Sequence, residues 1–157
     1  MNIKNLQNIN SVLKTRKVKD IMSRFAITTT SQTPVTDLAH LLLRFKISGV
    51  PVVNNNKEII GIVTATHLFN IMKQIIGKLE NAKEEYKSQK LFVEDIMIKN
   101  VFSVGEDDLL LDVINLMCKN NIYTLPVVSG KEIVGIIGRR DVLNVFYGKL
   151  NQVLQNG

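Results

Sequence analysis

Two short segments of the sequence place polar side chains where a predicted strand passes into a predicted helix. The first reads Gly61-Ile62-Val63-Thr64-Ala65-Thr66-His67, and the second reads Gly135-Ile136-Ile137-Gly138-Arg139-Arg140-Asp141. The first N–H groups of a helix have no partner within the helix, and the helix dipole favours negative charge there. Such a junction can therefore bind an anionic group, helped by a hydroxyl or guanidinium group beside it.

The same residues also fit a purely structural role. A hydroxyl followed three residues later by a carboxylate is close to a capping box, in which both side chains satisfy N–H groups at the start of a helix. Arg139 and Arg140 fit either a phosphate-binding pair or two solvated side chains at a helix start. The residues alone leave both interpretations open.

Both segments belong to an internal repeat. The sequence Val18-Lys19-Asp20-Ile21-Met22 returns as Val93-Glu94-Asp95-Ile96-Met97, and Val50-Pro51-Val52-Val53 returns at the same spacing as Leu125-Pro126-Val127-Val128. The two junction segments repeat at a spacing one residue shorter. A repeat that keeps its internal order indicates two copies of one folding unit. Because a copy of about 60 residues has a marginal core by itself, we expect the two copies to pack together across a pseudo-twofold axis.

The first copy is predicted to run helix, strand, strand, helix. Thr33 as N-cap and Pro34 at the first helical position open the first helix, and Gly49 marks its end. Val35, Leu38, Ala39 and Leu42 recur at the spacing of one buried helix face. The other predicted elements are an extended segment at 28–30, strands at 50–53 and 59–63 with a turn at 54–57, and a helix over about 66–78.

The second copy repeats this order, with Asp108 as the helix cap. The predicted elements are an extended segment at 102–104, a helix with its stripe at Leu110, Val113, Ile114 and Met117, strands at 127–128 and 133–137 with a turn at 129–130, and a helix over about 140–154. We therefore divide the chain into an N-terminal segment (1–17), a first repeat (18–76), a lysine- and glutamate-rich linker (77–92), a second repeat (93–150) and a C-terminal tail (151–157).

Composition is typical of a soluble globular protein, with 45% hydrophobic and 22% charged residues. No apolar run reaches the roughly 18 residues of a membrane span, and the first residues lack the apolar core of a signal peptide. The single cysteine, Cys118, excludes an internal disulfide and fits a reducing compartment. We expect a cytoplasmic protein without membrane contact, in which Cys118 is a buried and inert thiol.

Charge and motif content exclude several classes of function. The formal net charge of +6 favours anionic partners. The lysines are scattered, however, and the cluster at 14–19 lacks the interleaved aromatic residues of a single-strand binder, which argues against nucleic acid. The two histidines, His40 and His67, fall on different predicted helices, so we expect no metal site. The sequence has no P-loop, G-x-G-x-x-G segment or nucleophile with a nearby base, and we expect no catalysis.

The repeated motifs carry a resemblance to a known family. Asp-Ile-Met near the start of each copy, hydrophobic-Pro-Val-Val in its middle and Gly followed by two aliphatic residues near its end resemble a tandem pair of cystathionine-beta-synthase-type (CBS) domains over about residues 18–148. The resemblance implies an α/β (α+β) fold in which two pseudo-symmetric repeats, each a small sheet packed with helices, form one disc-like module. It also implies a regulatory module without catalysis, which binds an adenine nucleotide or S-adenosylmethionine in the cleft between the repeats.

The family motif at the end of each repeat resembles Gly-hydrophobic-hydrophobic-Thr/Ser-x-x-Asp, and this chain divides it between its copies. The first copy keeps the hydroxyl at Thr64 and has His67 in place of the aspartate. The second copy keeps Asp141 and has Gly138 in place of the hydroxyl. An ionised carboxylate can accept hydrogen bonds from both ribose hydroxyls, whereas a neutral histidine offers one acceptor nitrogen. The resemblance therefore places the ligand mainly in repeat 2, with Arg139 and Arg140 supplying charge for a phosphate.

The family also lines its base pocket with the residues just before each central Pro-Val-Val strand. Tyr123 there fits stacking on a purine, although an aromatic side chain beside an apolar strand also fits simple packing. The ligand-binding residues that the resemblance implies are Ser48, Gly49, Pro51, Thr64, His67, Tyr123, Thr124, Pro126, Gly138, Arg139, Arg140 and Asp141.

Two hypotheses for the function follow. In the first, the protein binds an adenosine-type ligand, needs no cofactor for chemistry, and passes the ligand state to an effector protein that the sequence does not identify. In the second, it is a ligand-free dimerisation scaffold, for which the divided motif is the evidence. Both include a homodimer, because the apolar faces of helices 66–78 and 140–154 exceed what one module of this size covers. The stripe expected at the contact is Leu143, Phe146, Tyr147 and Leu150.

Overall fold

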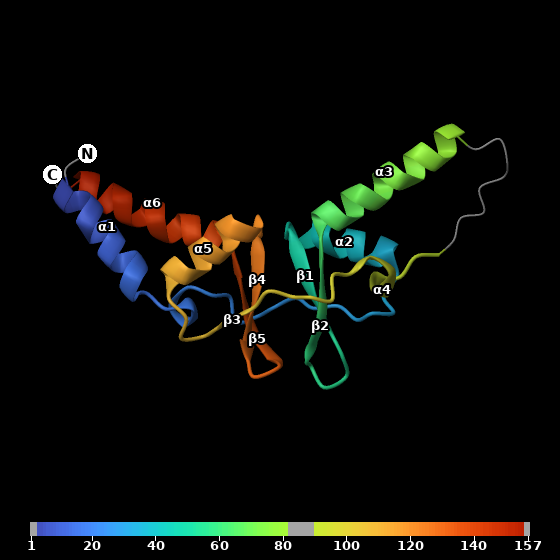
Figure 1. Ribbon diagram of the computed structural model, residues 1–157, viewed down its shortest axis with the longest axis horizontal. Helices are drawn as coiled ribbons and strands as arrows, with labels where there is room; N and C mark the ends of the chain where they lie inside the picture. The colour runs from blue at the N-terminus through green and yellow to red at the C-terminus, as the bar shows by residue number, and fades with distance from the viewer. Residues whose placement is uncertain (1–2, 82–89, 156–157) are drawn as a thin grey trace. The chain divides into compact units, whose positions relative to one another are not determined.

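The computed structural model describes residues 3–81 and 90–155, which fall into two compact units (Figure 1). One unit joins the residues up to Ala26 to those from Phe102 onward, and the other spans Ile27–Val101. Neither unit coincides with one copy of the sequence repeat. Each contains the Pro-Val-Val hairpin of one copy and the Asp-Ile-Met segment of the other.

The unit that spans Ile27–Val101 is built on one antiparallel hairpin. Its elements are α2 (Val35–Phe45), β1 (Gly49–Val53), β2 (Ile59–Thr64), α3 (Ala65–Asn81) and α4 (Val93–Ile96). The predicted turn at 54–57 joins β1 to β2 and contains Lys57 at a φ of 61°. Thr29 adds a single bridge to Val52 at the edge of β1. The buried side chains of this unit are Leu38, Leu42, Val50, Val52, Val63 and Val93.

The other unit has a three-stranded sheet. Its elements are α1 (Ile3–Thr15), the short 3-10 helix η1 (Val18–Asp20), β3 (Val104–Gly105), α5 (Leu110–Asn120), β4 (Thr124–Ser129), β5 (Glu132–Gly138) and α6 (Arg139–Gln155). β3 is parallel to β4, and β4 is antiparallel to β5. α1 packs against α5 and α6 (Figure 1). The buried side chains are Val18, Met22, Val104, Leu110, Val113, Met117, Leu125, Val127, Ile137 and Val142.

The Asp-Ile-Met segments explain why each unit needs residues from both copies. Val18 and Val93 have no exposed surface, so each fills the core of the unit that holds the other copy's hairpin. Asp20 accepts a hydrogen bond from the backbone N–H of Lys17 (3.1 Å). Asp95 likewise accepts one from the backbone N–H of the residue three positions before it. Each aspartate therefore caps the short helical turn that contains the buried valine, Val18 or Val93.

The methionines of the same segments pack on the two strand glycines. A Cβ atom on Gly135 would lie 2.8 Å from Met22 Sδ, and a Cβ atom on Gly61 would lie 2.7 Å from Met97 Sδ. Only a residue without a side chain permits this approach. The glycine of the Gly-aliphatic-aliphatic motif therefore leaves the space into which the methionine of the Asp-Ile-Met motif packs.

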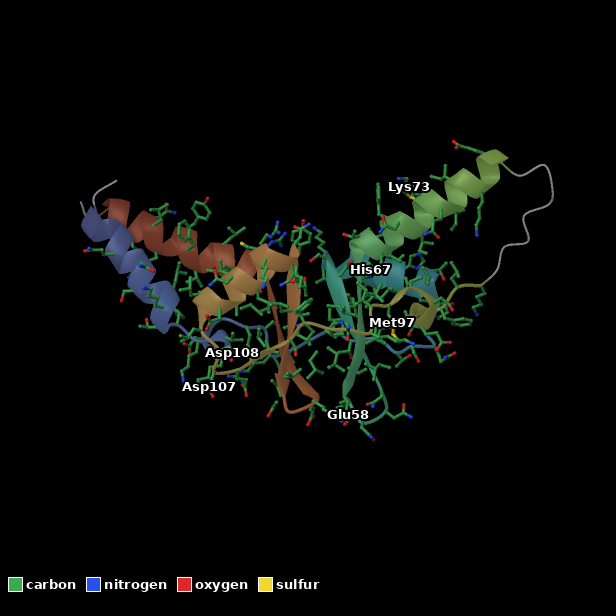
Figure 2. All side chains as sticks on the ribbon, viewed as in Figure 1. Glu58, His67, Lys73, Met97, Asp107 and Asp108 are labelled. Carbon is green, nitrogen blue, oxygen red and sulfur yellow. The ribbon has the colours of Figure 1, made fainter. Side chains whose placement is uncertain are left out.

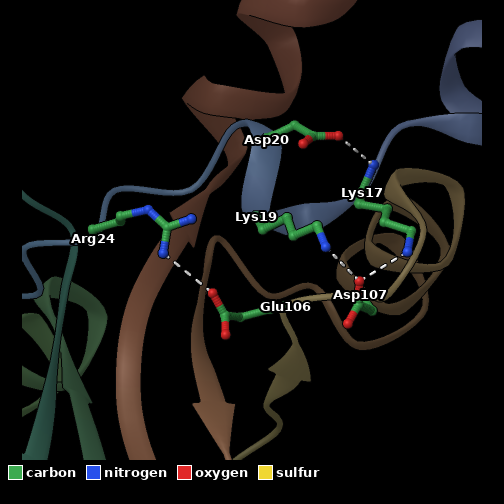
Figure 3. A network of polar contacts seen from close by, with 6 residues as sticks. All are labelled: Lys17, Lys19, Asp20, Arg24, Glu106 and Asp107. Carbon is green, nitrogen blue, oxygen red and sulfur yellow. Dashed lines mark hydrogen bonds and ion pairs between the residues drawn. The ribbon is translucent and has the colours of Figure 1, made fainter.

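Charged side chains add a second set of contacts between residues 17–24 and the loop before α5 (Figure 3). Lys17 Nζ and Lys19 Nζ each lie 2.8 Å from Asp107 Oδ1, and Arg24 Nη1 lies 3.2 Å from Glu106 Oε1. The hydrogen bonds from Lys17 and Lys19 lower the pKa of Asp107 to about 2. Because Asp107 is exposed, these pairs fix the path of the segment more than they stabilise the fold.

Four sequence-based expectations about the helix ends differ from the structure. Pro34 is the N-cap of α2 and not its first helical residue. Thr33 and Asp108 do not cap their helices: Thr33 Oγ1 accepts the N–H of Thr30 (3.4 Å) and Asp108 Oδ2 accepts that of Gly105 (2.8 Å), so both close the turn before the helix. Gly49 lies inside β1, not at the end of α2. The left-handed position there belongs to Lys46, at a φ of 52°.

Three further differences concern the N-terminal segment, Cys118 and the start of the linker. Residues 3–15, assigned above only to an N-terminal segment, form the helix α1. Cys118 is exposed, because it follows Met117 around α5 and only Met117 faces the core. α3 continues to Asn81, so the start of the predicted linker is helical, and residues 82–89 lie outside the described residues.

Candidate functional site

The end of the β4–β5 hairpin brings four of the predicted site residues together. Thr124 pairs with Gly138 in the antiparallel register, and α6 begins at the next residue. The N–H of Arg139 donates a hydrogen bond to the carbonyl oxygen of Tyr123 (2.9 Å), which extends the strand pairing by one step into the helix. The strand register therefore fixes Tyr123 beside the start of α6.

Asp141 caps this helix. Its Oδ2 accepts a hydrogen bond from the backbone N–H of Gly138 at 2.7 Å, a short distance that fits a charged acceptor. The capping interpretation is thus correct for Asp141, and among the described residues this bond uses one of the two carboxylate oxygens. A carboxylate has about four acceptor positions, so the capping bond leaves capacity for a further donor.

Arg139 and Tyr123, predicted to serve a phosphate and a purine separately, lie against each other. The guanidinium carbon of Arg139 is 3.7 Å from the centre of the Tyr123 ring, a cation–π contact. The Tyr123 hydroxyl lies 3.0 Å from Asn121 Oδ1 and donates a hydrogen bond to it. Tyr123 keeps 40% of its surface exposed, its hydroxyl is held by Asn121, and Arg139 lies over its ring.

The remaining predicted residues of this unit differ in exposure. Arg140 is exposed and Thr124 is buried. Pro126 is buried opposite Ile136 in the hairpin, where it shapes the strand and presents little surface to a ligand. The polar surface of the junction is thus formed by Tyr123, Arg139, Arg140 and Asp141, which we call the Asp141 junction.

The other unit contains an equivalent junction with different chemistry. Gly49 pairs with Thr64, and the N–H of Ala65 donates to the carbonyl oxygen of Ser48 (2.9 Å), as Arg139 does to Tyr123. The N–H of Thr64 donates to His67 Nδ1 at 3.1 Å (His67 is labelled in Figure 2). Ser48 is exposed, Gly49 and Pro51 are buried, and Thr64 and His67 are half-buried.

This hydrogen bond fixes the protonation of His67. Nδ1 must carry a lone pair to accept the N–H of Thr64, so the ring is neutral and its proton is on Nε2. Burial lowers the pKa of His67 below its ordinary 6.5, which favours the same neutral form. His67 therefore offers a donor where Asp141 offers an acceptor, and the two junctions are not chemically equivalent.

The state of His67 predicts how stability depends on pH. Because the pKa of His67 is lowered in the folded chain, the unfolded chain binds a proton first as the pH falls below 6.5, and acid then favours unfolding. We expect the urea midpoint to fall between pH 7.5 and 5.5 in the parent. The decrease should be smaller in His67→Asp, whose carboxylate (ordinary pKa about 3.9) stays ionised and keeps the cap.

The control for this prediction is the other histidine. His40 is exposed on α2, so His40→Gln should show the same decrease with pH as the parent. An equal decrease in His67→Asp and in the parent would contradict the role assigned to His67.

Sequence reasoning missed Asn121, which anchors Tyr123. The sequence did contain a signal. Asparagine is second only to glycine in adopting the left-handed conformation at a helix end, and Asn121 has a φ of 54°. It also missed the Arg139–Tyr123 contact, because that contact depends on the strand register.

Comparison with known proteins agrees with this geometry. The model of the CBS domain matches residues 18–74 and 93–148. The chain belongs to the CBS domain family. The Asp141 junction and its counterpart at His67 are thus the strand–helix ends of two CBS repeats.

Three relatives show what this CBS pair is similar to. It is 30% identical over 84% of its length to an L-aspartate semialdehyde sulfurtransferase of Methanocaldococcus jannaschii, of which it covers 23%. It is 30% identical over 90% of its length to an uncharacterized protein, MJ1426, of the same organism, of which it covers 96%. A crystal structure of the CBS domain pair of protein MJ0100, in complex with 5-methylthioadenosine and S-adenosyl-L-methionine, is 30% identical, with a TM-score of 0.74, over 85% of this chain and 98% of that one.

The chain spans only about a quarter of the first two curated relatives, 23% and 26% of their lengths. The enzymatic names of those relatives therefore describe much longer proteins. Within residues 3–81 and 90–155, no helix has the length and apolar character needed to cross a bilayer.

Proposed function

We propose that this CBS pair is a regulatory module without catalysis, which binds an adenosine-containing ligand mainly through the Asp141 junction. The observation that carries the proposal is the Asp141 carboxylate, which caps α6 with one oxygen and keeps acceptor capacity for ribose hydroxyls. Arg139 and Arg140 add positive charge beside it. The CBS pair of MJ0100 supports the ligand class, since that relative was crystallised with two adenosine compounds.

We expect the equivalent junction at His67 to bind the ligand more weakly than the Asp141 junction. A neutral histidine whose Nδ1 is occupied by Thr64 has only a donor left, and ribose hydroxyls there would lose the charged acceptor that Asp141 provides. We therefore assign one principal ligand to each chain. Output to an effector protein requires that the ligand bind two states of the module with different affinity.

A thermal-shift screen with adenosine, AMP, ADP, ATP and S-adenosylmethionine tests the proposal. A ligand at 100 times its dissociation constant stabilises the folded state by about 2.7 kcal/mol. For a chain of this size that corresponds to a rise in Tm of roughly 5–11 °C. No rise with any of these compounds would favour the ligand-free scaffold.

We also propose that the module is a homodimer that uses the exposed faces of α3 and α6. Phe69, Met72 and Ile76 follow one face of α3 with 66%, 46% and 47% of their surfaces exposed. On α6, Leu143 and Tyr147 are 45% and 54% exposed, whereas Phe146 and Leu150 of the predicted stripe are half-buried. Apolar stripes of this kind are typical of contact surfaces.

Light scattering at tens of micromolar should therefore give the mass of a dimer. Phe69→Glu places a charge in the stripe and should shift the mass towards the monomer, because an unpaired charge is disfavoured in an apolar contact. Gln74→Glu adds the same charge at an exposed position of the same helix and should leave the dimer intact. A monomeric parent, or equal masses for the two variants, would contradict this assignment.

A further inference from the structure

The resting position of Arg139 covers the ring that the proposed ligand would use. Its guanidinium carbon lies 3.7 Å from the centre of the Tyr123 ring. Cation–π contacts at exposed sites are weak, whereas a guanidinium forms strong paired hydrogen bonds with a phosphate or carboxylate. An anionic group at the Asp141 junction would therefore compete successfully with the ring for Arg139.

The surroundings allow Arg139 to move while Tyr123 stays in place. The Tyr123 hydroxyl is held by Asn121 (3.0 Å) and its carbonyl oxygen by the N–H of Arg139 (2.9 Å). The Arg139 side chain is exposed, and among residues 3–81 and 90–155 it forms no ion pair with a carboxylate. Within the described part of the chain, the guanidinium thus has no carboxylate partner and lies against an aromatic face.

We propose that Arg139 is an anion-dependent gate on Tyr123, which makes the site selective for adenosine ligands that carry an anionic group on the 5′ side. In the empty site the guanidinium covers the ring. A 5′ phosphate or carboxylate draws the guanidinium away, and the uncovered ring then stacks on the adenine. This inference rests on the proposed function, because it assigns the selectivity of the same junction.

The gate predicts opposite effects of one substitution on two ligands. Adenosine has no anionic group, so it must displace Arg139 from Tyr123 without compensation, whereas AMP replaces that contact with hydrogen bonds to its phosphate. Arg139→Ala should therefore strengthen adenosine binding about two- to fivefold, through loss of the competing cation–π contact. The same substitution should weaken AMP binding about tenfold to a hundredfold.

Arg140 provides the matched control. Arg140 has the same charge as Arg139, follows it in the chain and is also exposed. Among the described residues, the cation–π contact with the Tyr123 ring belongs to Arg139 and not to Arg140. Arg140→Ala should weaken AMP through loss of charge and leave adenosine unchanged. S-adenosylmethionine, which carries a carboxylate and no phosphate, shows which anionic group Arg139 requires. If a carboxylate suffices, Arg139→Ala should weaken S-adenosylmethionine binding as it weakens AMP binding. If a phosphate is required, the affinity for S-adenosylmethionine should change as that for adenosine does.

Isothermal titration calorimetry on the full chain measures all of these affinities, with thermal unfolding as the check that each variant is folded. NMR adds a readout of the gate itself. Ring current should shift the Arg139 side-chain protons upfield in the free protein, and saturation with AMP, but not with buffer alone, should remove this shift.

The outcomes separate the gate from the proposed function. If the parent binds AMP but Arg139→Ala changes AMP and adenosine affinity in the same direction, the gate is wrong and the ligand site stands. If Arg139 and Arg140 variants behave alike for both ligands, Arg139 acts only by charge and the gate is again overturned. If the parent binds no adenosine compound, the proposed function fails and the gate fails with it.

Discussion

Replacing Asp141 with alanine should lower the affinity for the adenosine ligand tenfold to a hundredfold, as measured by calorimetry. Hydrogen bonds to a charged acceptor contribute about 1.5–3 kcal/mol, and the substitution removes the acceptor. It also leaves the N–H of Gly138 without its capping partner, so the folded state should lose about 0.5–2 kcal/mol. Undiminished ligand affinity in Asp141→Ala would place the ligand elsewhere.

Asp141→Asn separates the two roles of this residue. Its amide oxygen can still accept the N–H of Gly138, so most of the stability should remain. The charge and one acceptor oxygen are lost, so the ligand affinity should still fall. If Asp141→Asn keeps both stability and affinity, the aspartate serves only as a helix cap.

Replacing Gly135 with alanine should destabilise the unit that contains it by about 1–3 kcal/mol, the usual penalty of inserting a methyl group into a packed site. The new Cβ atom would lie 2.8 Å from Met22 Sδ and 2.8 Å from the carbonyl oxygen of Ser23. That oxygen cannot move freely, because it accepts the N–H of Ile136 at 2.9 Å. Urea unfolding of the parent and the variant measures the difference.

Alanine substitutions at two other glycines serve as controls for this prediction. Gly61→Ala meets Met97 Sδ at 2.7 Å but the nearest backbone oxygen only at 3.2 Å, so a shift of the flexible thioether should make its penalty smaller than that of Gly135→Ala. Gly148 lies in α6, and no atom of the described residues lies within 4 Å of an added Cβ. Gly148→Ala should therefore stabilise the fold by about 0.5–1 kcal/mol. Equal effects at Gly135 and Gly148 would contradict the packing described for Met22.

The hairpins and the main helices could be predicted because local sequence determines them. Gly130, at a φ of 62°, forms the expected turn between β4 and β5, and Leu38 and Leu42 face the core as their spacing indicates. The predicted helix caps were wrong by one residue, since the N-caps are Pro34 and Leu109. Thr33 and Asp108 have the residue types of caps, but their hydrogen bonds go to the preceding turn, and sequence alone does not distinguish these two uses of one side chain.

The exchange of Asp-Ile-Met segments depends on contacts that no local pattern reveals. Met22 lies more than a hundred residues before Gly135 in the chain, and nothing near either residue indicates that they touch. The same holds within the candidate site. The motif located Asp141 and Arg139, but the stacking of Arg139 on Tyr123 follows from the register in which Thr124 pairs with Gly138.

The central claim is that the Asp141 junction is the principal ligand site. Calorimetric stoichiometry per chain tests this claim most directly. Titration with AMP should give about one site in the parent. In Asp141→Ala that site should be absent or strongly weakened, and in His67→Asp, which restores a carboxylate beside Thr64, the count should rise towards two. One site of unchanged affinity in all three proteins would contradict the account.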